Sequence, residues 1–229
     1  MNEMGESARS GRETQGETRN DAGRLGLART HFAAGIGARL TGALTAMLLL
    51  WCDGALAAGP KVILLRGWLG VFSTGLDSIA DQLKAQGIET KVAGHLYWSN
   101  AVADIVRERS AGQIGPLVLV GHSQGANNVI DMARSLESHN ITIDVLVTLS
   151  PFMQNAVPAN VVKAINYYQS AGWGQPLAGD HNFHGKIVNV DLAADPTITH
   201  VSIDKSAKVQ AEILREIIAL ARQSNERKK

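Results

Sequence analysis

The sequence predicts an α/β fold, a three-layer sandwich in which helices cover both faces of a mainly parallel sheet of about six strands. From residue 61 onward, short runs of Val, Ile and Leu alternate with helical patterns, and this βα alternation is what builds a parallel sheet. The runs are almost continuously apolar, as strands are when both faces are covered by helices. The prediction depends on the repeated alternation, because any single apolar run is also compatible with a buried helix.

Each expected strand is a short run rich in β-branched, apolar or aromatic residues. In chain order the six runs are KVILL (61–65), ETKVA (89–93), PLVLV (116–120), IDVLVTL (143–149), KAINYY (163–168) and KIVNVDL (186–192).

Helices are expected between these strands, because apolar residues recur there at spacings of three and four. The first, over residues 74–86, begins with Thr74 and Asp77 at the spacing of a capping box. The second covers residues 99–111 with Ser99 as a possible cap. The third and fourth carry their apolar stripes over residues 126–133 and 206–222.

The composition excludes several classes of protein. The chain has 229 residues, a formal net charge of +1 and a pI near 7.9, and no basic aromatic-rich patch indicates nucleic-acid binding. Cys52 is the only cysteine, so an internal disulfide framework and a cysteine-based structural zinc site are both excluded.

Three regions are predicted along the chain. Residues 1–30 are polar and rich in Gly, Ser, Thr, Glu, Arg and Asn, which is typical of a disordered tail. Residues 31–57 combine basic residues, a short apolar run and the small residues Ala55 and Ala57 at the two positions that a signal peptidase reads. This is the pattern of a signal peptide, cleaved after Ala57, of an exported, periplasmic or secreted protein. The alternative is a membrane anchor over residues 31–58, although the run is shorter than a bilayer requires. Residues 58–229 form the α/β domain.

One serine lies between two glycines at a predicted strand-to-helix junction. Gly121-His122-Ser123-Gln124-Gly125 follows the run PLVLV and precedes a helical pattern. Such a turn holds the serine in a strained conformation at the carboxyl end of a strand, where reactive groups of parallel sheets lie. The glycines remove side chains that would collide with neighbouring backbone.

The stretch VLVGHSQGA with this context resembles the nucleophile elbow of the α/β-hydrolase superfamily, and GHSQG is common among its lipases and esterases. The resemblance covers roughly residues 61–220 and implies a minimal hydrolase core without a large cap domain. It further implies an acidic residue and then a histidine downstream of Ser123.

His200 is the predicted general base, because it follows the last strand and precedes the final helix, the position that the resemblance implies. His181 and His184 are the alternative base candidates, or weak metal-ligand candidates. His122 is expected to pack beneath the elbow rather than to act as the base.

The acid is predicted to be Asp191, which ends the final strand directly before the loop of His200. Asp180 is the alternative acid, and Asp195 is a third candidate. The resemblance implies an acid after the run KAINYY, yet no carboxylate occurs between Lys163 and Gly179.

An oxyanion hole requires two backbone N–H donors. The first is expected from Gln124, and the second from Trp68 or Leu69 in the loop after the first strand. Arg66, where relatives often have His, is expected to pair with a carboxylate or an anionic product. Trp68, Leu69, Val71 and Phe72 form an apolar cluster that is expected either to pack in the core or to bind substrate, with Tyr97 and Trp98 extending it.

The sequence therefore predicts a serine hydrolase that cleaves a carboxylic ester or thioester, including lipid esters, through an acyl-enzyme on Ser123. No metal or cofactor is expected, and membrane contact is expected only through the N-terminal segment. The alternative is a catalytically silent α/β-hydrolase fold that binds a partner or lipid in the cell envelope.

Overall fold

The computed structural model describes residues 58–68, 70–153 and 155–227. The predicted tail, the predicted signal peptide and Leu69 lie outside the described residues. Among the described helices, none is long and apolar enough to cross a membrane.

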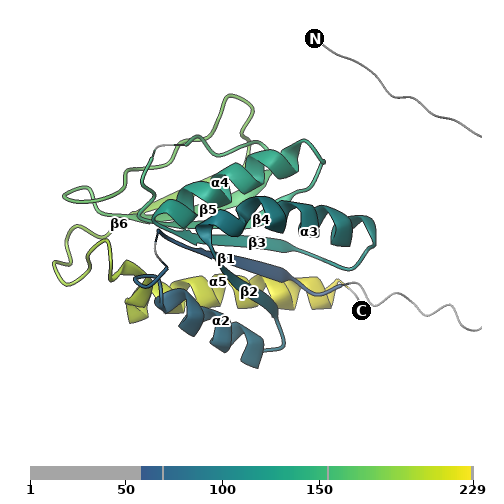
Figure 1. Cartoon of the computed structure of the whole chain (residues 1–229), viewed down its shortest axis with the longest axis horizontal. Coiled ribbons are helices and arrows are strands. Elements are labelled where there is room, and N and C mark those ends of the chain that lie inside the picture. Colours follow the sequence, from purple (N-terminus) through teal and green to yellow (C-terminus); the bar gives the residue numbers. More distant parts are fainter. Residues whose placement is uncertain (1–57, 69, 154, 228–229) are drawn as a thin grey trace, which may run out of the picture. The chain divides into compact units, whose positions relative to one another are not determined.

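Six parallel strands form one sheet in the order β2-β1-β3-β4-β5-β6 (Figure 1). Every neighbouring pair is parallel, so all six carboxyl ends lie at one edge. The strands are β1 (Lys61–Arg66), β2 (Glu89–Gly94), β3 (Leu117–His122), β4 (Ile143–Leu149), β5 (Val161–Tyr168) and β6 (Lys186–Asp191). All six predicted runs are strands, with ends that differ by at most two residues.

Helices cover both faces of the sheet, as predicted. On one face α2 (Gly75–Ala85) and α5 (Ala207–Glu226) pack against one apolar cluster of strand side chains. On the other face α3 (Trp98–Ser110) and α4 (Gln124–Glu137) pack against a second cluster. Figure 1 shows these pairs on opposite sides of the sheet. The α/β three-layer sandwich is therefore confirmed.

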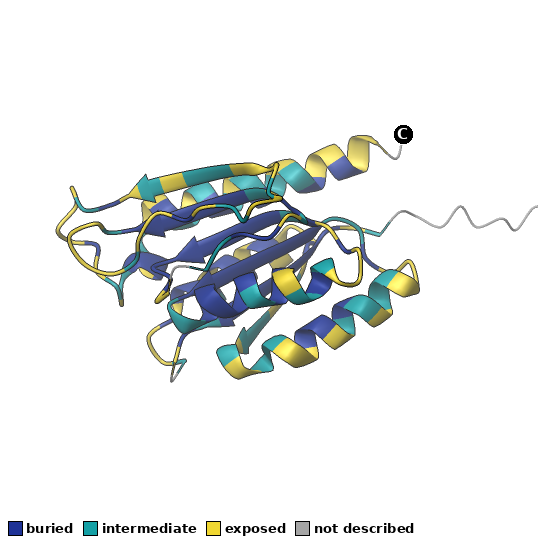
Figure 2. Cartoon of the chain, turned by 90° about the horizontal axis from the view of Figure 1, so that it is seen from above, coloured by how far each residue is buried: buried dark blue, intermediate teal, exposed yellow. Residues whose placement is uncertain are grey.

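The inner strands are the most buried part of the sheet. All six residues of β3 are buried, whereas the edge strands β2 and β6 contain no buried residue. In Figure 2 the central strands are dark blue and the helices alternate between blue and yellow. This burial pattern explains why the inner strands read as continuous apolar runs and the edge strands as mixed ones.

Two predicted helix caps are wrong. Thr74 makes no side-chain hydrogen bond at the start of α2, and its backbone is helical (φ −71°, ψ −17°) rather than extended as at a capping residue. The Asp77 carboxylate, the other half of the predicted box, pairs with the Arg66 guanidinium. The carboxylate of Asp204, far along the chain, accepts the first N–H of α2 at 2.7 Å. Ser99 is not a cap either, since α3 begins one residue earlier, after the short 3-10 turn η1 (His95–Tyr97).

Candidate active site

Ser123 lies on a sharp turn between β3 and α4. Its backbone has φ 57° and ψ −121°, a conformation that costs a residue with a Cβ atom free energy and that persists only where its surroundings impose it. The Ser123 N–H donates to the Leu149 carbonyl at 2.9 Å, which attaches the turn to the end of the neighbouring strand β4. The strained elbow that the sequence predicts is present.

Gly121 and Gly125 allow this turn because their positions leave no space for a side chain. A Cβ on Gly121 would lie 2.2 Å from the carbonyl oxygen of Gly125, and a Cβ on Gly125 would lie 2.2 Å from that of Leu65. Both distances are far shorter than van der Waals contact. The first turn of α4 can therefore lie directly against β3 and β1, and the serine projects from the carboxyl edge of the sheet.

His200 meets Ser123 at this edge. It lies in the loop between β6 and α5, and its Nε2 atom is 2.9 Å from the Ser123 Oγ atom. The imidazole ring also packs against two other rings, with centroid distances of 4.8 Å to Trp173 and 5.4 Å to His122. The predicted nucleophile and the predicted base, which are 77 residues apart in the chain, are therefore joined by a hydrogen bond.

The environment of His200 keeps its imidazole neutral. Burial, with a smaller contribution from His122, lowers the pKa of His200 to about 4. A neutral imidazole can accept a proton from the Ser123 hydroxyl, which is what a general base must do. The arrangement is able to activate a serine nucleophile.

The predicted acid does not reach the base. The Nδ1 atom of His200 is buried, and no described residue forms a hydrogen bond with it. Asp191 is exposed, and its Oδ1 accepts the N–H groups of Ser170 at 3.1 Å and Ala193 at 2.9 Å. A side-chain hydrogen bond from Ser170 lowers the pKa of Asp191 most, and the N–H groups of Ala193 and Ser170 lower it further. Asp191 thus orders its own turn at the end of β6.

Neither of the other two acid candidates contacts His200. The Asp180 carboxylate lies 3.7 Å from the guanidinium of Arg134. Arg134 is eleven residues along α4 from Ser123, roughly 16 Å down the helix axis. Asp195 lies in the same loop as His200, but its Oδ1 is occupied by the backbone N–H and the hydroxyl of Thr197.

Gln124 and the loop after β1, which are predicted to supply the oxyanion donors, lie beside Ser123. Gln124 is the first residue of α4, where backbone N–H groups have no intrahelical acceptor. The loop after β1 approaches closely, because a Cβ on Gly67 would lie 2.9 Å from the Cβ of Ser123. The Gly67 N–H itself donates to the Ser73 hydroxyl. Of the two residues predicted to supply the donor from this loop, Trp68 lines the same cavity as Ser123, and Leu69 lies outside the described residues.

Ser73 is a site residue that the sequence analysis missed. Its hydroxyl lies 2.8 Å from the Nδ1 atom of His122, and the other ring nitrogen of His122 lies 2.7 Å from the carbonyl oxygen of His200. Both Ser73 and His122 are 1% exposed. The burial of His122 beneath the elbow agrees with the sequence analysis. No pattern in the sequence distinguishes Ser73 from other loop serines.

The Arg66 guanidinium forms an ion pair with Asp77. Pairing with a carboxylate was one of the two roles expected of Arg66, the other being contact with an anionic product. Its Nε atom donates to Asp77 Oδ2 at 3.3 Å, and a second guanidinium nitrogen contacts Oδ1. This pair joins the end of β1 to the first turn of α2. Arg66 therefore supports the loop that carries Trp68.

A cavity of about 740 Å³ opens at Ser123 and His200. The expected substrate-binding residue Phe72 lines it, together with Trp68, whereas Leu69 lies outside the described residues. The expected extension is correct for Trp98, while the Tyr97 hydroxyl binds Asp104 instead. The other apolar or aromatic side chains on its wall are those of Leu96, Phe152, Trp173 and Val201.

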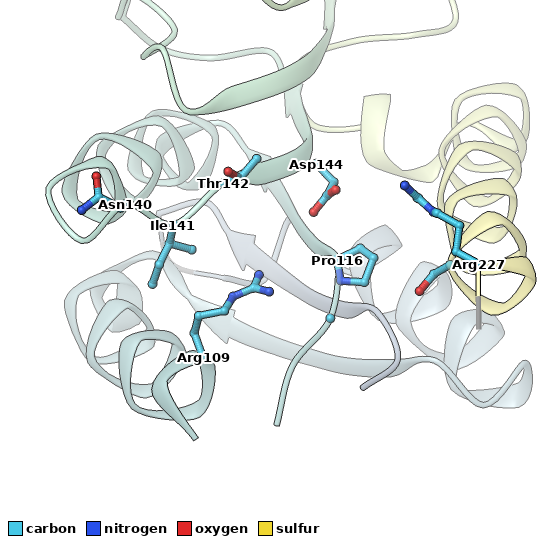
Figure 3. Close-up of a pocket in the computed structure, with 9 residues that line it drawn as sticks. Arg109, Pro116, Asn140, Ile141, Thr142, Asp144 and Arg227 are labelled. Carbon is cyan, nitrogen blue, oxygen red and sulfur yellow. The ribbon is translucent and has the colours of Figure 1, made fainter. Parts of the chain in front are cut away.

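A second cavity, of about 440 Å³, lies at the opposite end of the sheet (Figure 3). Figure 3 shows Arg109 and Asp144 pointing into it. The Asp144 carboxylate accepts the N–H of Leu117 at 2.8 Å, which caps the start of β3.

His181 and His184, the alternative candidates for the base or a metal site, line neither the cavity at Ser123 nor this second cavity. No cluster of three or more metal-ligating side chains exists among the residues that the structure describes.

The site has the arrangement of an α/β-hydrolase core. Its serine lies on a strained strand-to-helix turn at the carboxyl edge of a parallel sheet, and it is bonded to a histidine from the last strand-to-helix loop.

Several solved structures are similar. Est1E from Butyrivibrio proteoclasticus with bound ferulic acid matches with a TM-score of 0.48 and 12% identity, over 74% of this chain and 92% of its own.

Human thioesterase 2 matches with a TM-score of 0.46 and 14% identity, over 73% of this chain and 98% of its own. A cutinase-like protein from Cryptococcus sp. matches with a TM-score of 0.45 and 15% identity, over 72% and 96%. At these identities and TM-scores the likeness is confined to the general fold. No protein-family model and no curated protein sequence matches the chain.

Proposed function

We propose that this protein is a serine hydrolase that cleaves carboxylic esters or thioesters with an apolar acyl group. One observation carries the proposal. The Ser123 hydroxyl, presented on a strained turn, is hydrogen-bonded at 2.9 Å to a neutral imidazole at the mouth of an apolar cavity. A nucleophile within hydrogen-bond reach of its base is the diagnostic geometry of covalent catalysis by serine.

The reaction follows from this geometry. Ser123 Oγ attacks the carbonyl carbon of the substrate while its proton passes to Nε2 of His200. The oxyanion that forms accepts hydrogen bonds from the N–H groups of Gln124 and Trp68. His200 then returns the proton to the departing alcohol or thiol, which leaves an acyl group on Ser123. A water molecule, deprotonated by His200, releases the acid and restores the hydroxyl.

The acyl group is assigned from the wall of the cavity. Trp68, Phe72, Leu96, Phe152 and Trp173 are between 49% and 80% exposed and surround the nucleophile. An apolar chain that covers them would gain about 0.8 kcal/mol for each CH₂ group that it buries. This supports fatty acyl or aromatic acyl groups over small polar ones.

Hydrolysis of p-nitrophenyl butyrate by the full chain tests the proposal. Wild-type protein should release p-nitrophenol, and Ser123→Ala should lower kcat by about 10⁴-fold or more, because the residual rate then comes only from binding and the oxyanion donors. The unfolding midpoints of wild type and Ser123→Ala, measured in parallel, should agree, which shows that the variant is folded. Equal rates for the two proteins, both folded, would rule the proposal out.

A second candidate function is supported by the unpartnered Nδ1 atom of His200. Without a carboxylate at this atom the fold could hold an apolar acyl ligand without hydrolysing it. This candidate predicts that both wild type and His200→Ala fail to hydrolyse p-nitrophenyl butyrate, while decanoic acid binds wild type and perturbs the fluorescence of Trp68 or Trp173.

We also propose that residues 31–57 direct export, with removal after Ala57, and that a retained anchor is the alternative. The basis is the sequence pattern alone. The mass of the mature N-terminal peptide from the native host decides between the two, since export with cleavage predicts a chain that begins at Ala58.

A further inference from the structure

His200 lacks the contact that usually orients a catalytic histidine. In a serine hydrolase a buried carboxylate on Nδ1 holds the tautomer and the orientation of the imidazole. Here Nδ1 has no hydrogen-bond partner among the described residues. The orientation of the ring must therefore come from other contacts, and those on its backbone and faces are the ones that the structure provides.

The backbone of His200 is held by His122. Its carbonyl oxygen lies 2.7 Å from the Nε2 atom of His122. A carbonyl oxygen can only accept, so this nitrogen of His122 carries the proton. The His122 ring also packs against the His200 ring at a centroid distance of 5.4 Å. The His122 side chain thus contacts both the main chain of His200 and one face of the His200 imidazole.

The other side of His122 reaches the loop after β1, which carries the proposed oxyanion donor Trp68. With the proton on Nε2, Nδ1 must accept, and it lies 2.8 Å from the Ser73 hydroxyl, which donates. The Ser73 oxygen in turn accepts the N–H of Gly67 at 2.9 Å. A continuous chain of hydrogen bonds thus connects Gly67, the residue before Trp68, through Ser73 and His122 to the main chain of His200.

The charge state of His122 supports this direction of hydrogen bonding. Burial lowers the pKa of His122, opposed by its contact with the His200 backbone and by the nearby carboxylate of Asp204. The Lys205 ammonium lowers this pKa further. A neutral His122 can accept from Ser73 and donate to His200 at the same time, which a protonated ring cannot do.

We infer that His122 is a positioning residue of this site. Through Ser73 it holds the loop that carries Trp68, and through the His200 carbonyl it holds the general base, so that both keep their places around Ser123. This inference rests on the proposed function for its kinetic consequence. The orientation of the His200 ring is a separate property that can be measured without substrate.

Three variants test the inference in the full chain. His122→Leu removes both hydrogen bonds at similar volume, whereas His122→Gln retains a donor and an acceptor near the same places. Thr148→Val is the matched control, because Thr148 is a buried residue of β4 whose hydroxyl binds Asn166 at 2.9 Å and does not line the cavity. It removes a buried hydrogen bond of similar kind outside the site.

For p-nitrophenyl butyrate, His122→Leu should lower kcat by about 10²-fold, the loss that a displacement of about 1 Å causes, with KM changed less than about threefold. His122→Gln should recover kcat to within about tenfold of wild type. Thr148→Val should lower the unfolding midpoint and leave kcat unchanged. Recovery by Gln distinguishes positioning from the general loss of packing.

A titration of His200 by NMR gives the second readout. In wild type its pKa should be near 4. In His122→Leu it should rise toward the ordinary value near 6.5, because a released ring becomes hydrated and the electrostatic contribution of His122 is lost. His122→Gln loses the same electrostatic contribution but keeps the ring in place, so its smaller rise measures that contribution alone. Unchanged kcat and an unchanged His200 pKa in His122→Leu would overturn the inference, as would equal defects in the Gln and Leu variants. If wild type hydrolyses no ester, the proposed function fails, and the titration still decides the role of His122.

Discussion

Ser123 combines two features that are seldom found together in a structural serine. Its backbone has a positive φ of 57°, and its hydroxyl is bonded to a partly buried histidine from a distant loop. Strained conformations persist where the surrounding structure imposes them, and they concentrate at functional sites. The elbow glycines and the bond from the Ser123 N–H to Leu149 supply that constraint here.

The pKa of His200 makes a prediction for the pH profile. Burial lowers it to about 4, so the imidazole is neutral and able to accept a proton at every pH well above that value. As the pH falls through about 4, His200 gains a proton and cannot deprotonate Ser123. We expect kcat/KM for p-nitrophenyl butyrate to be level between about pH 5 and 7 and to fall with a midpoint near 4.

Circular dichroism at each pH controls for acid unfolding in that experiment. A midpoint near 6.5, the ordinary value for histidine, in protein that remains folded would contradict the buried environment described for His200.

Asp191 makes a second prediction at this scale. Because its carboxylate orders the turn at Ser170 and Ala193, Asp191→Asn should keep kcat within about threefold of wild type. The loss of the orienting acid from a triad costs about 10⁴-fold. Steady-state kinetics with p-nitrophenyl butyrate distinguishes these values clearly, and a loss of 10³-fold or more would restore Asp191 as the acid.

At the scale of the elements, the site depends on loops that follow the carboxyl ends of β1, β3 and β6. The parallel sheet brings these three ends to one edge, and buried hydrogen bonds then attach the loops to one another. The start of α2 depends on the same principle. The carboxylate of Asp204, which is fully buried, accepts the N–H of Gly75 at 2.7 Å, and a Cβ on Gly75 would lie 2.1 Å from the Asp204 carbonyl oxygen.

Asp204 therefore makes a prediction for stability. Asp204→Ala should lower the free energy of unfolding by roughly 1–3 kcal/mol, because a buried N–H at the start of α2 loses its acceptor. Asp204→Asn keeps an oxygen in place and should lose less. Chemical denaturation measures both, with the exposed Asp195→Asn as the control. An Asn variant as unstable as the Ala variant would contradict the role of this hydrogen bond.

The sequence predicted most of this framework for identifiable reasons. Inner strands such as β3 are buried on both faces and read as continuous apolar runs, and the elbow has a local pattern of two glycines around Ser123. His200 is predicted to lie at Ser123 because it is in the loop between the last strand and the final helix. The predicted capping box is wrong although Thr74 and Asp77 have the right spacing, because Thr74 has helical backbone and the Asp77 carboxylate pairs with Arg66.

The sequence could not predict that no candidate carboxylate reaches Nδ1 of His200, or which contacts His122 makes, for a different reason. Which carboxylate reaches a histidine depends on the paths of whole loops, and Asp180, Asp191 and Asp195 were all compatible with the order of residues. Ser73 carries no pattern at all, since its importance arises only when the loop after β1 folds against His122. Contacts between distant loops have no periodicity that a sequence can reveal.

At the scale of the described domain, apolar side chains gather around the site. Among the large apolar side chains that the described residues expose, all but Val162 lie in loops that follow the carboxyl ends of strands. We call this set the apolar rim: Trp68, Val71, Phe72, Leu96, Phe152, Met153, Trp173 and Val201. All of its members except Val71 and Met153 line the cavity at Ser123, which is the basis for the apolar acyl group in the proposed function.

The rim makes a prediction about chain length. Over p-nitrophenyl acetate, butyrate and octanoate, kcat/KM should rise, by up to about fourfold for each CH₂ that the rim buries. Phe152→Ala should reduce the rate with octanoate and leave that with acetate nearly unchanged. Val162→Ala, on β5 outside the rim, is the matched control. A profile that is highest for acetate, or a Phe152→Ala defect that is equal for all esters, would contradict the role of the rim.

The central claim is that Ser123 is a nucleophile activated by His200, and covalent labelling tests it most directly. Full-length protein is treated with a fluorophosphonate, digested with trypsin and analysed by mass spectrometry. The peptide of residues 110–134 contains Ser123. We predict one phosphonate on Ser123 in wild type, much slower labelling in His200→Ala, and none at this peptide in Ser123→Ala. Wild-type protein that stays unlabelled while folded, or a Ser123→Ala variant labelled as fast as wild type, would contradict the account.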